Sequence, residues 1–306
     1  MNTPYPVIEI EPEWVKDREQ MGSKDKFWFR RTEAEKKRDW LFKYPTPGTG
    51  QHWAEKIAYE IALEMGLRLT PRVELAMLQG EPGSATLNFV TKDSGYELFH
   101  GNQILAGMDA GYDPEKRYGQ KLHTVERIFQ SMQTFPNAHF ADKCRRSIAL
   151  YLVLDAIICN VDRHHENWGI LRKRNKEQWR GRLAPTYDHA SSLGHNLQDT
   201  GGKQNRERYL NELGVSKYVE RGHGAIFVEP ESKKAPSPLD LVRYCLSEVQ
   251  YAPHFQPALH RVAALERENV EAIVNRIPEP WMTPLARKFA IELVLHNVSE
   301  LNQLNT

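Results

Sequence analysis

The sequence predicts an α+β fold in which a small, strand-rich N-terminal lobe precedes a larger helical C-terminal lobe. Short aromatic or alternating segments fill the chain before residue 92, with one strong helix among them, and long apolar-periodic segments dominate after residue 122. The 306 residues suffice for two closely packed lobes with a real hydrophobic core. We therefore expect an N-terminal lobe over residues 1–92 and a C-terminal lobe over residues 93–306.

The strands expected in the N-terminal lobe are short aromatic or alternating segments. They are residues 26–30 (KFWFR), 39–44 (DWLFKY), 72–78 and 85–90. The turn signal EPGS at residues 81–84 makes the last two strands a hairpin. Apolar residues at every fourth position predict a helix over residues 51–65, which Gly66 ends.

Helices are expected to dominate the C-terminal lobe. We predict them at residues 124–132, 142–159, 239–248, 259–276 and 285–301. The second half of the 142–159 segment is almost unbroken apolar sequence, which predicts a central, buried helix. The basic run RKRNK at residues 172–176 is assigned to a solvated hairpin tip between two strands.

Composition excludes several functional classes. Lys and Arg total 41 against 40 Asp and Glu, a net charge of +1, so we expect no dedicated nucleic-acid coat and no direct nucleic-acid binding. The three cysteines form no C-x-x-C pair, which fits a reducing cytoplasm better than a disulfide framework. The polar start of the chain has no secretory pattern, and the most apolar stretch, residues 148–159, is too short to cross a bilayer. We expect a cytoplasmic protein.

The most informative polar segment, NVDRHHEN at residues 160–167, follows the most apolar helix directly. Asp162 and Asn167 have the Asp-x-x-x-x-Asn spacing of a phosphotransferase catalytic loop. A carboxylate can accept or orient the proton of an attacking hydroxyl, and an amide oxygen can bind magnesium without repelling phosphates. The spacing recurs at Asp155 and Asn160, so a helix-capping loop remains the alternative.

Three further residues extend this interpretation. Asp188 follows a short strand signal and could supply a carboxylate to magnesium, with a turn or cap residue as the alternative. Lys43 lies among apolar residues on a predicted strand, where a lysine either reaches solvent or pairs with a charge. Glu55, on the following helix, lies off the apolar stripe and is either simply exposed or an anchor for Lys43.

The order of a strand lysine, a helix glutamate, an Asp-x-x-x-x-Asn loop and a strand-end aspartate resembles a protein-kinase-like, two-lobed fold. More narrowly, the chain resembles the HipA-like serine/threonine kinases, the toxin components of bacterial toxin–antitoxin pairs. The resemblance spans about residues 20–300. It is carried by GSKDKFWF (22–29), LFKYP (41–45), HWAEKIAYEIALEMGL (52–67), NVDRHHEN (160–167) and APTYDHASSL (184–193).

The resemblance implies a serine/threonine protein kinase that uses ATP and Mg²⁺. The family's Asp-x-His-x-x-Asn catalytic loop falls on Asp162, His164 and Asn167, with Asp162 and His164 in the catalytic role. Asn167 and Asp188 are the implied magnesium ligands. Lys43 would contact the nucleotide phosphates and be positioned by Glu55.

Other implied nucleotide contacts lie in two segments. The adenine is expected beside Phe89, Val90 and Thr91, and the phosphate-side loop is Gly22, Ser23 and Lys24. Ser23 is a candidate for autophosphorylation. This loop has no G-x-G-x-x-G pattern, and Tyr-Asp-His replaces Asp-Phe-Gly around Asp188. The short segment before the loop indicates a compact member with the kinase core only.

The implied partners are a protein substrate, such as an aminoacyl-tRNA synthetase or another translation component, and a DNA-binding antitoxin. Two alternatives stay open: a pseudokinase that binds ATP without transferring phosphate, and a small-molecule or lipid phosphotransferase of the same fold. A transition-metal cluster at residues 164–166 and His189 is less favoured, because adjacent histidines rarely point at one metal and no H-E-x-x-H spacing exists.

Overall fold

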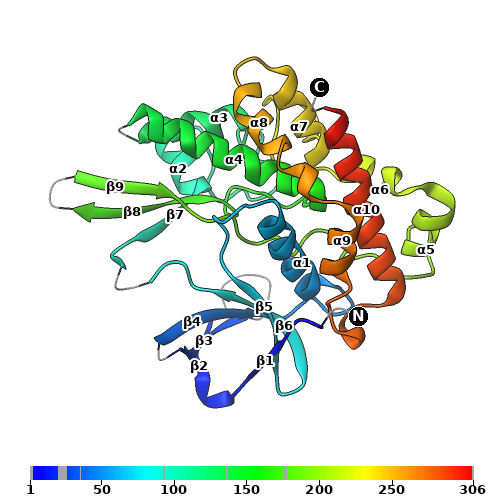
Figure 1. Ribbon diagram of the computed structural model, residues 1–306. Helices are drawn as coiled ribbons and strands as arrows, with labels where there is room; N and C mark the ends of the chain where they lie inside the picture. Colours follow the sequence, from blue (N-terminus) through cyan, green and yellow to red (C-terminus); the bar gives the residue numbers. More distant parts are fainter. Residues whose placement is uncertain are drawn as a thin grey trace.

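The computed structural model has the predicted α+β architecture, with a curled sheet at one end and helices at the other (Figure 1). It describes residues 3–19, 26–34, 36–91, 94–135, 137–175 and 178–304. The predicted phosphate-side loop, Gly22, Ser23 and Lys24, lies outside the described residues. So do residues 92 and 93, and the lobe boundary between them stays a prediction.

Six strands form the N-terminal sheet, in the order β1-β5-β6-β4-β3-β2. Their bounds are β1 Val7–Ile10, β2 Val15–Glu19, β3 Lys26–Glu33, β4 Lys36–Lys43, β5 Val73–Leu78 and β6 Glu81–Leu87. The four predicted strands correspond to β3–β6. Alternation places Phe27 and Phe29 of β3, with Trp40 and Phe42 of β4, in one buried cluster. Lys26 and Trp28, which alternate with these phenylalanines along β3, face the other side of the sheet.

The hairpin between β5 and β6 turns two residues earlier than predicted. Its turn is Gln79 and Gly80, whose φ angles of 51° and 85° suit a two-residue hairpin turn. The predicted turn at residues 81–84 is wrong, because these residues pair with β5. Pro82 is tolerated there because β4 pairs with β6 only from Ser84 to Leu87.

Helix α1 (Gln51–Glu64) lies between the sheet and the helical lobe (Figure 1). It contacts β5 and β6 on one side and α4 (Ala138–Ile158) and α9 (Arg267–Val274) on the other. Both sides of α1 are therefore covered, and Glu55 is buried although it lies off the apolar stripe. Gly66, with a φ of 71°, ends the helical turn as predicted.

The central helix of the C-terminal lobe is α4, whose second half is buried as predicted. It begins at Ala138, earlier than predicted, because the side chain of Asn137 accepts a hydrogen bond from the backbone N–H of Phe140. The other α-helices are α2 Gly101–Met108, α3 Val125–Ser131, α5 Arg206–Arg208, α6 Val215–Arg221, α7 Pro238–Ser247, α8 Ala252–Leu259, α9 Arg267–Val274 and α10 Pro284–Gln303. The shorter helical segments are η1 Pro12–Trp14, η3 Met132–Thr134, η4 Tyr209–Leu213, η5 Val262–Ala264 and η6 Glu279–Trp281.

The single helix predicted over residues 259–276 is wrong. The chain forms α8, the short segment η5 and α9 instead, because Leu265 (φ −92°, ψ 65°) and Glu266 (φ −71°, ψ 160°) leave the helical conformation. Leu259, Val262 and Val270 are nevertheless buried. The apolar spacing therefore predicted correctly which residues are buried, but it wrongly predicted one unbroken helix.

A second sheet of three strands, β7 (Glu97–His100), β8 (Gly169–Asn175) and β9 (Gln178–Leu183), joins the helical lobe in the order β7-β8-β9. The strands on either side of the predicted tip are confirmed, but the basic run lies mostly within β8 itself. Among the described residues, no helix is long and apolar enough to span a membrane.

Candidate functional site

A cavity of about 950 Å³ lies between the N-terminal sheet and the helical lobe. Its size falls in the range typical of small-molecule and cofactor sites. The predicted site residues that line it are Lys43, Phe89, Val90, Asp162, His164, Asn167 and Asp188. Glu55 lies behind this lining, buried in α1, and Thr91 is not part of the lining. Seven of the side chains singled out from sequence therefore meet at one hollow.

Lys43, at the end of β4, forms an ion pair with Asp188, with 3.1 Å between Lys43 Nζ and Asp188 Oδ1. Burial would lower the pKa of the Lys43 ammonium, but the carboxylates of Asp188 and Glu55 raise it above its usual value. Lys43 therefore stays charged at neutral pH. Asp188 has a left-handed backbone with a φ of 60°, a conformation that aspartate tolerates better than most residues.

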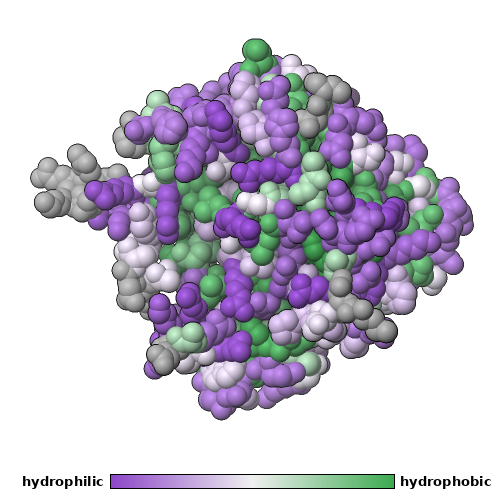
Figure 2. Space-filling model, viewed as in Figure 1, coloured by the Kyte–Doolittle hydropathy of each residue, from purple (hydrophilic) through white to green (hydrophobic). Residues whose placement is uncertain are grey.

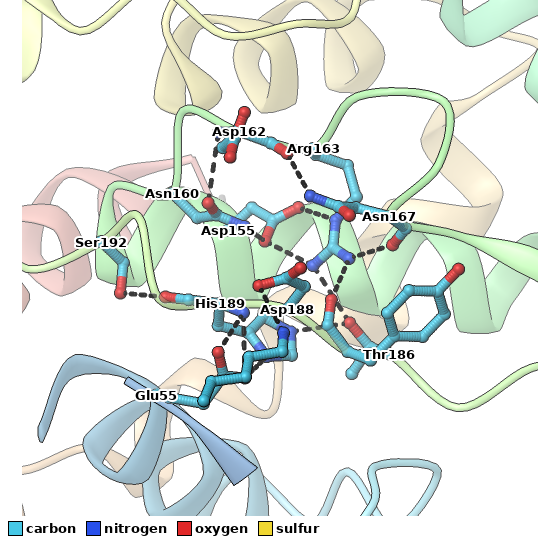
Figure 3. Close-up of polar contacts among 12 residues, drawn as sticks. Glu55, Asp155, Asn160, Asp162, Arg163, Asn167, Thr186, Asp188, His189 and Ser192 are labelled. Atoms are coloured by element: carbon cyan, nitrogen blue, oxygen red, sulfur yellow. Dashed lines mark hydrogen bonds and ion pairs between the residues drawn. The ribbon is translucent and has the colours of Figure 1, made fainter. Parts of the chain in front are cut away.

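Glu55 reaches the same site through a neighbour of Asp188 (Figure 3). Both of its carboxylate oxygens accept a hydrogen bond from the backbone N–H of His189 at 3.0 Å, and Oε1 lies 3.4 Å from His189 Nδ1. Burial would raise the pKa of Glu55, but the bond to His189 and the charge of Lys43 lower it. Lys43 therefore pairs directly with Asp188, while Glu55 acts on Lys43 over a longer distance.

The loop that follows α4 holds Asp162 and Asn167. The Asp162 backbone N–H donates to the side-chain oxygen of Asn160 at 3.2 Å, and the Asp162 carboxylate accepts from Ser191 Oγ at 3.3 Å. The Asn167 amide NH₂ donates to the backbone oxygen of Asp162 at 2.8 Å. That bond fixes the amide and leaves Asn167 Oδ1 as the atom that can accept or ligate.

Arg163 holds this loop from behind (Figure 3). Its guanidinium makes two bonds of 2.7 Å to the buried carboxylate of Asp155 on α4, and it donates to the backbone oxygens of Asn167 at 2.6 Å and Tyr187 at 3.0 Å. Asn160 also donates to Asp155, at 2.7 Å. The second Asp-x-x-x-x-Asn pair, Asp155 and Asn160, is therefore a structural brace beneath the loop.

His164 is buried beside Asp162, with 4.0 Å between His164 Nε2 and Asp162 Oδ1. Its Nδ1 accepts the backbone N–H of Glu166 at 3.2 Å. Burial, followed by the nearby charge of Arg117, lowers the pKa of His164 to about 4. The ring is therefore neutral at pH 7, and its remaining N–H is on the nitrogen nearest Asp162.

The sequence analysis did not predict several of the residues that line the cavity. Lys26 and Trp28 of β3 line the cavity, and Lys26 lies directly opposite Lys43 in the β3–β4 ladder. The sequence contains a signal for their position: Phe27 and Phe29 point into the core, so the residues that alternate with them along β3 must point to the opposite face of the sheet. Tyr187 stacks on Phe89 with 5.5 Å between the ring centroids, and its hydroxyl donates to the backbone oxygen of Glu166 at 2.8 Å.

The opposite wall of the cavity comes from the irregular segment between α2 and α3. Arg117 forms an ion pair with Glu166, and the rings of Tyr118 and His164 lie nearly perpendicular to each other with 6.0 Å between their centroids. Tyr118 is 66% exposed, unusually high for a large aromatic residue beside a cavity. Nothing in the periodicity of this segment indicated its position.

The donor set suits a magnesium ion. Mg²⁺ prefers hard oxygen ligands, commonly one or two protein groups plus substrate phosphates. Asp188 offers a carboxylate and Asn167 an amide oxygen fixed by its own hydrogen bond, both toward the cavity. These two residues would hold the ion.

The curled sheet, the helical lobe and the polar cleft between them define a kinase-like fold. The chain belongs to the family of the HipA-like C-terminal domain, whose family model matches residues 20–277. No curated protein matches the chain in sequence.

Solved structures of other kinase-like proteins resemble this one, among them the following two. The Helicobacter pylori proinflammatory kinase CtkA matches with a TM-score of 0.76 at 17% identity, over 98% of this chain and 99% of that one. HipA from the Shewanella oneidensis MR-1 toxin–antitoxin system, solved with HipB and its operator DNA, matches with a TM-score of 0.55 at 12% identity, over 95% of this chain and 65% of that one. At these identities, the likeness establishes the fold.

Proposed function

We propose that this chain is a serine/threonine protein kinase that uses ATP and Mg²⁺. The observation that carries the proposal is the convergence of Lys43, Asp162, Asn167 and Asp188 on one cavity between the lobes. Phosphoryl transfer needs a cation at the phosphates, oxygen ligands for magnesium and a carboxylate at the acceptor hydroxyl. The family and the two structural relatives support the same class of reaction.

Each residue has a defined task in this proposal. Lys43 contacts the nucleotide phosphates, and Asp162 orients or accepts the proton of the acceptor hydroxyl. His164 is a positioning residue, since its neutral ring presents an N–H toward Asp162. Magnesium, bound by Asn167 and Asp188, would neutralise charge on the phosphates. Catalysis then rests on positioning and on charge neutralisation.

The nucleotide base is proposed to lie at the end of the cavity lined by Phe89 and Val90. Phe89 is stacked on Tyr187, and Leu41 and Leu98 add apolar surface from β4 and β7. An adenine ring in contact with these side chains would be shielded from water on its faces. Thr91 and the loop with Ser23 stay predictions, and mapping of phosphorylated residues tests Ser23.

The decisive experiment incubates the protein with γ-labelled ATP, Mg²⁺ and a cell lysate. We expect label in protein seryl or threonyl groups, and we expect Asp162→Asn to lower the rate by about 10²–10⁴-fold, the usual contribution of a positioned acid or base. Asp142→Asn is the matched control, because Asp142 lies on α4 in an exposed ion pair with Arg146. Transfer by Asp162→Asn at the wild-type rate would refute the assignment.

Thermal shift with ATP and Mg²⁺ separates the alternatives. Ligand binding stabilises the folded state by mass action, so Asp162→Asn should keep the nucleotide-dependent shift while losing transfer. A shift in the wild-type protein without transfer to any acceptor would identify a pseudokinase. Label in inositide vesicles or aminoglycosides, but not in protein, would identify a lipid or small-molecule phosphotransferase.

The proposed partners follow from the family. HipA is found with HipB and operator DNA in the Shewanella complex, so we propose that a DNA-binding antitoxin binds this chain as well. A translation component such as an aminoacyl-tRNA synthetase is the proposed substrate. Identification of the labelled lysate proteins tests the substrate, and co-purification from the native host tests the antitoxin. We also propose a cytoplasmic location.

A further inference from the structure

The three-stranded sheet carries an excess of positive charge that the cleft does not use. Its basic residues are Arg172, Lys173, Arg174, Arg180 and Arg182. Glu97 of β7 is the one acidic residue in the described parts of the three strands, whose net charge is therefore 5 − 1 = +4. The net charge of the whole chain is only +1. None of the five forms an ion pair with a described carboxylate, unlike Arg146, Arg208, Lys217 and Arg267 elsewhere in the helical lobe.

The strand register places three of these cations on one face. Lys173 lies directly opposite Arg180, and Leu171 lies directly opposite Arg182. Directly paired residues point to the same side of a sheet, so Lys173, Arg180 and Arg182 form what we call the basic face. Like charges in directly opposed positions destabilise a sheet, and an anion bound across them would relieve that repulsion.

An aromatic ring orients two of the three cations. Lys173 Nζ lies 4.8 Å and the Arg182 guanidinium carbon 4.6 Å from the centre of the Tyr96 ring. Arg180 and Arg182 are exposed. The β8–β9 hairpin projects from the body of the molecule, and hydrophilic residues cover its described part (Figures 1 and 2). The basic face is therefore held in place and open to a large partner.

We propose that the basic face binds the phosphodiester backbone of a nucleic acid. Guanidinium groups match phosphate oxygens in a fork geometry, and two of the three cations are arginines. Alternate side chains along a strand lie about 6.6 Å apart, so the face offers a row of charge to a repeating polyanion. A guanidinium group that packs on a tyrosine ring with one face still has its other face available for stacking on a base. This proposal revises the expectation from net charge that the chain binds no nucleic acid, and it is independent of the proposed kinase activity.

The basic face lies close to the cavity between the lobes. Leu98 of β7 lines the cavity and lies in one register row with Leu171 and Arg182. Leu98 and Arg182, at the two ends of that row, are separated by two β-strand spacings of about 4.8 Å each. A nucleic acid bound at Arg182 would therefore lie roughly 10 Å from the cavity wall. Nucleic acid on this face is thus placed beside the cavity without occupying it.

The test measures fluorescence anisotropy of labelled single-stranded RNA and of DNA of the same sequence, without ATP. With three phosphate contacts, the slope of log K against log salt should be about −2, a loss of roughly 20-fold between about 50 and about 200 mM salt. The triple variant Lys173→Gln, Arg180→Gln, Arg182→Gln should lose this binding and most of the slope. Equal binding of RNA and DNA supports backbone recognition, and preference for RNA supports it with added contacts to the 2′-hydroxyl.

A charge-matched control separates the face from overall charge. The triple variant Arg208→Gln, Lys217→Gln, Arg267→Gln removes three cations that already have carboxylate partners, so both variants go from +1 to 1 − 3 = −2. The control should bind like the wild type. Equal weakening of both variants, or no binding by the wild type, overturns the proposal. Displacement by polyglutamate as efficient as by unlabelled RNA would overturn it in favour of an acidic polypeptide partner.

Discussion

Arg163 and Asp155 form a buried, two-pronged ion pair that joins the candidate catalytic loop to the central helix. Arg163 Nε and Nη2 each lie 2.7 Å from a carboxylate oxygen of Asp155, and both side chains are about 95% buried or more. The same guanidinium donates to the backbone oxygen of Asn167, itself a proposed magnesium ligand, and to that of Tyr187, which directly precedes the other ligand, Asp188. One buried side chain thus fixes the loop, the helix and the segment leading to Asp188 relative to one another.

Removing one partner of this pair should be costly. Arg163→Met leaves Asp155 as a buried charge without its counterion, and we expect a loss of about 3–5 kcal/mol in the free energy of unfolding. Urea denaturation measures it. The matched control is Arg146→Met, which breaks an exposed pair with Asp142 on the same helix and should cost less than about 1 kcal/mol. Similar losses in the two variants would contradict the role given to Arg163.

Two glycines on α2 offer a sharper comparison. A Cβ added at Gly101 would lie 2.6 Å from the backbone oxygen of His165 and 2.3 Å from the Trp168 ring, whereas one at Gly107 would meet nothing within 4 Å. Gly101→Ala should therefore destabilise the protein by about 1–3 kcal/mol through overpacking. Gly107→Ala should stabilise it by about 0.5–1 kcal/mol, because alanine favours the helix. Thermal unfolding of both variants checks the opposite signs, and a shared sign would refute this account.

The sequence predicted the local elements well where one physical signal dominated. The alternation of Phe27 and Phe29 with polar neighbours predicted β3, and the spacing of Trp53, Ile57 and Ile61 predicted α1. The sequence left alternatives open where tertiary contacts decide. Glu55 lies off the apolar stripe of α1, yet it is buried because a second lobe covers that side of the helix.

The same limit applies to the candidate site. Sequence order singled out Lys43, Asp162, Asn167 and Asp188, and they do line one cavity. The role of Arg163 could not be predicted, because it depends on tertiary contacts with Asp155 and Tyr187 that a linear pattern does not reveal. The wall at Arg117 and Tyr118 belongs to an irregular segment, where periodicity carries no information.

Acid should destabilise the fold through His123. Its Nδ1 donates to the backbone oxygen of Ala225 at 2.9 Å, and its Nε2 accepts from Trp168 Nε1 at 3.0 Å, so the buried ring is neutral. Burial lowers its pKa to about 3, against 6.5 for the unfolded chain. The unfolded state therefore binds more protons between pH 6.5 and about 3, and stability is present above this window and lost as pH falls through it.

The measurement is the free energy of unfolding as a function of pH. His123 should contribute a slope of up to about 1.4 kcal/mol per pH unit within that window. His123→Asn should flatten the dependence, whatever its effect on stability at neutral pH. The exposed His139→Asn serves as the control and should keep the wild-type slope. An unchanged slope in His123→Asn would show that other groups carry the acid sensitivity.

The charge of Glu55 should be visible in the pH dependence of phosphate transfer. Glu55 and Asp188 together hold the pKa of Lys43 above its usual value against the effect of burial. Glu55→Gln keeps the size of the side chain and removes its charge, so the Lys43 pKa falls and the alkaline limb of the rate profile moves to lower pH. At neutral pH we expect a loss of about tenfold in kcat/KM, or ~1.4 kcal/mol. Rate profiles of the wild type, Glu55→Gln and Glu64→Gln check this prediction, because Glu64 is exposed at the end of the same helix. If Glu55→Gln lowered the rate by the same factor at every pH, Glu55 would have a packing role and the proposed coupling to Lys43 would be wrong.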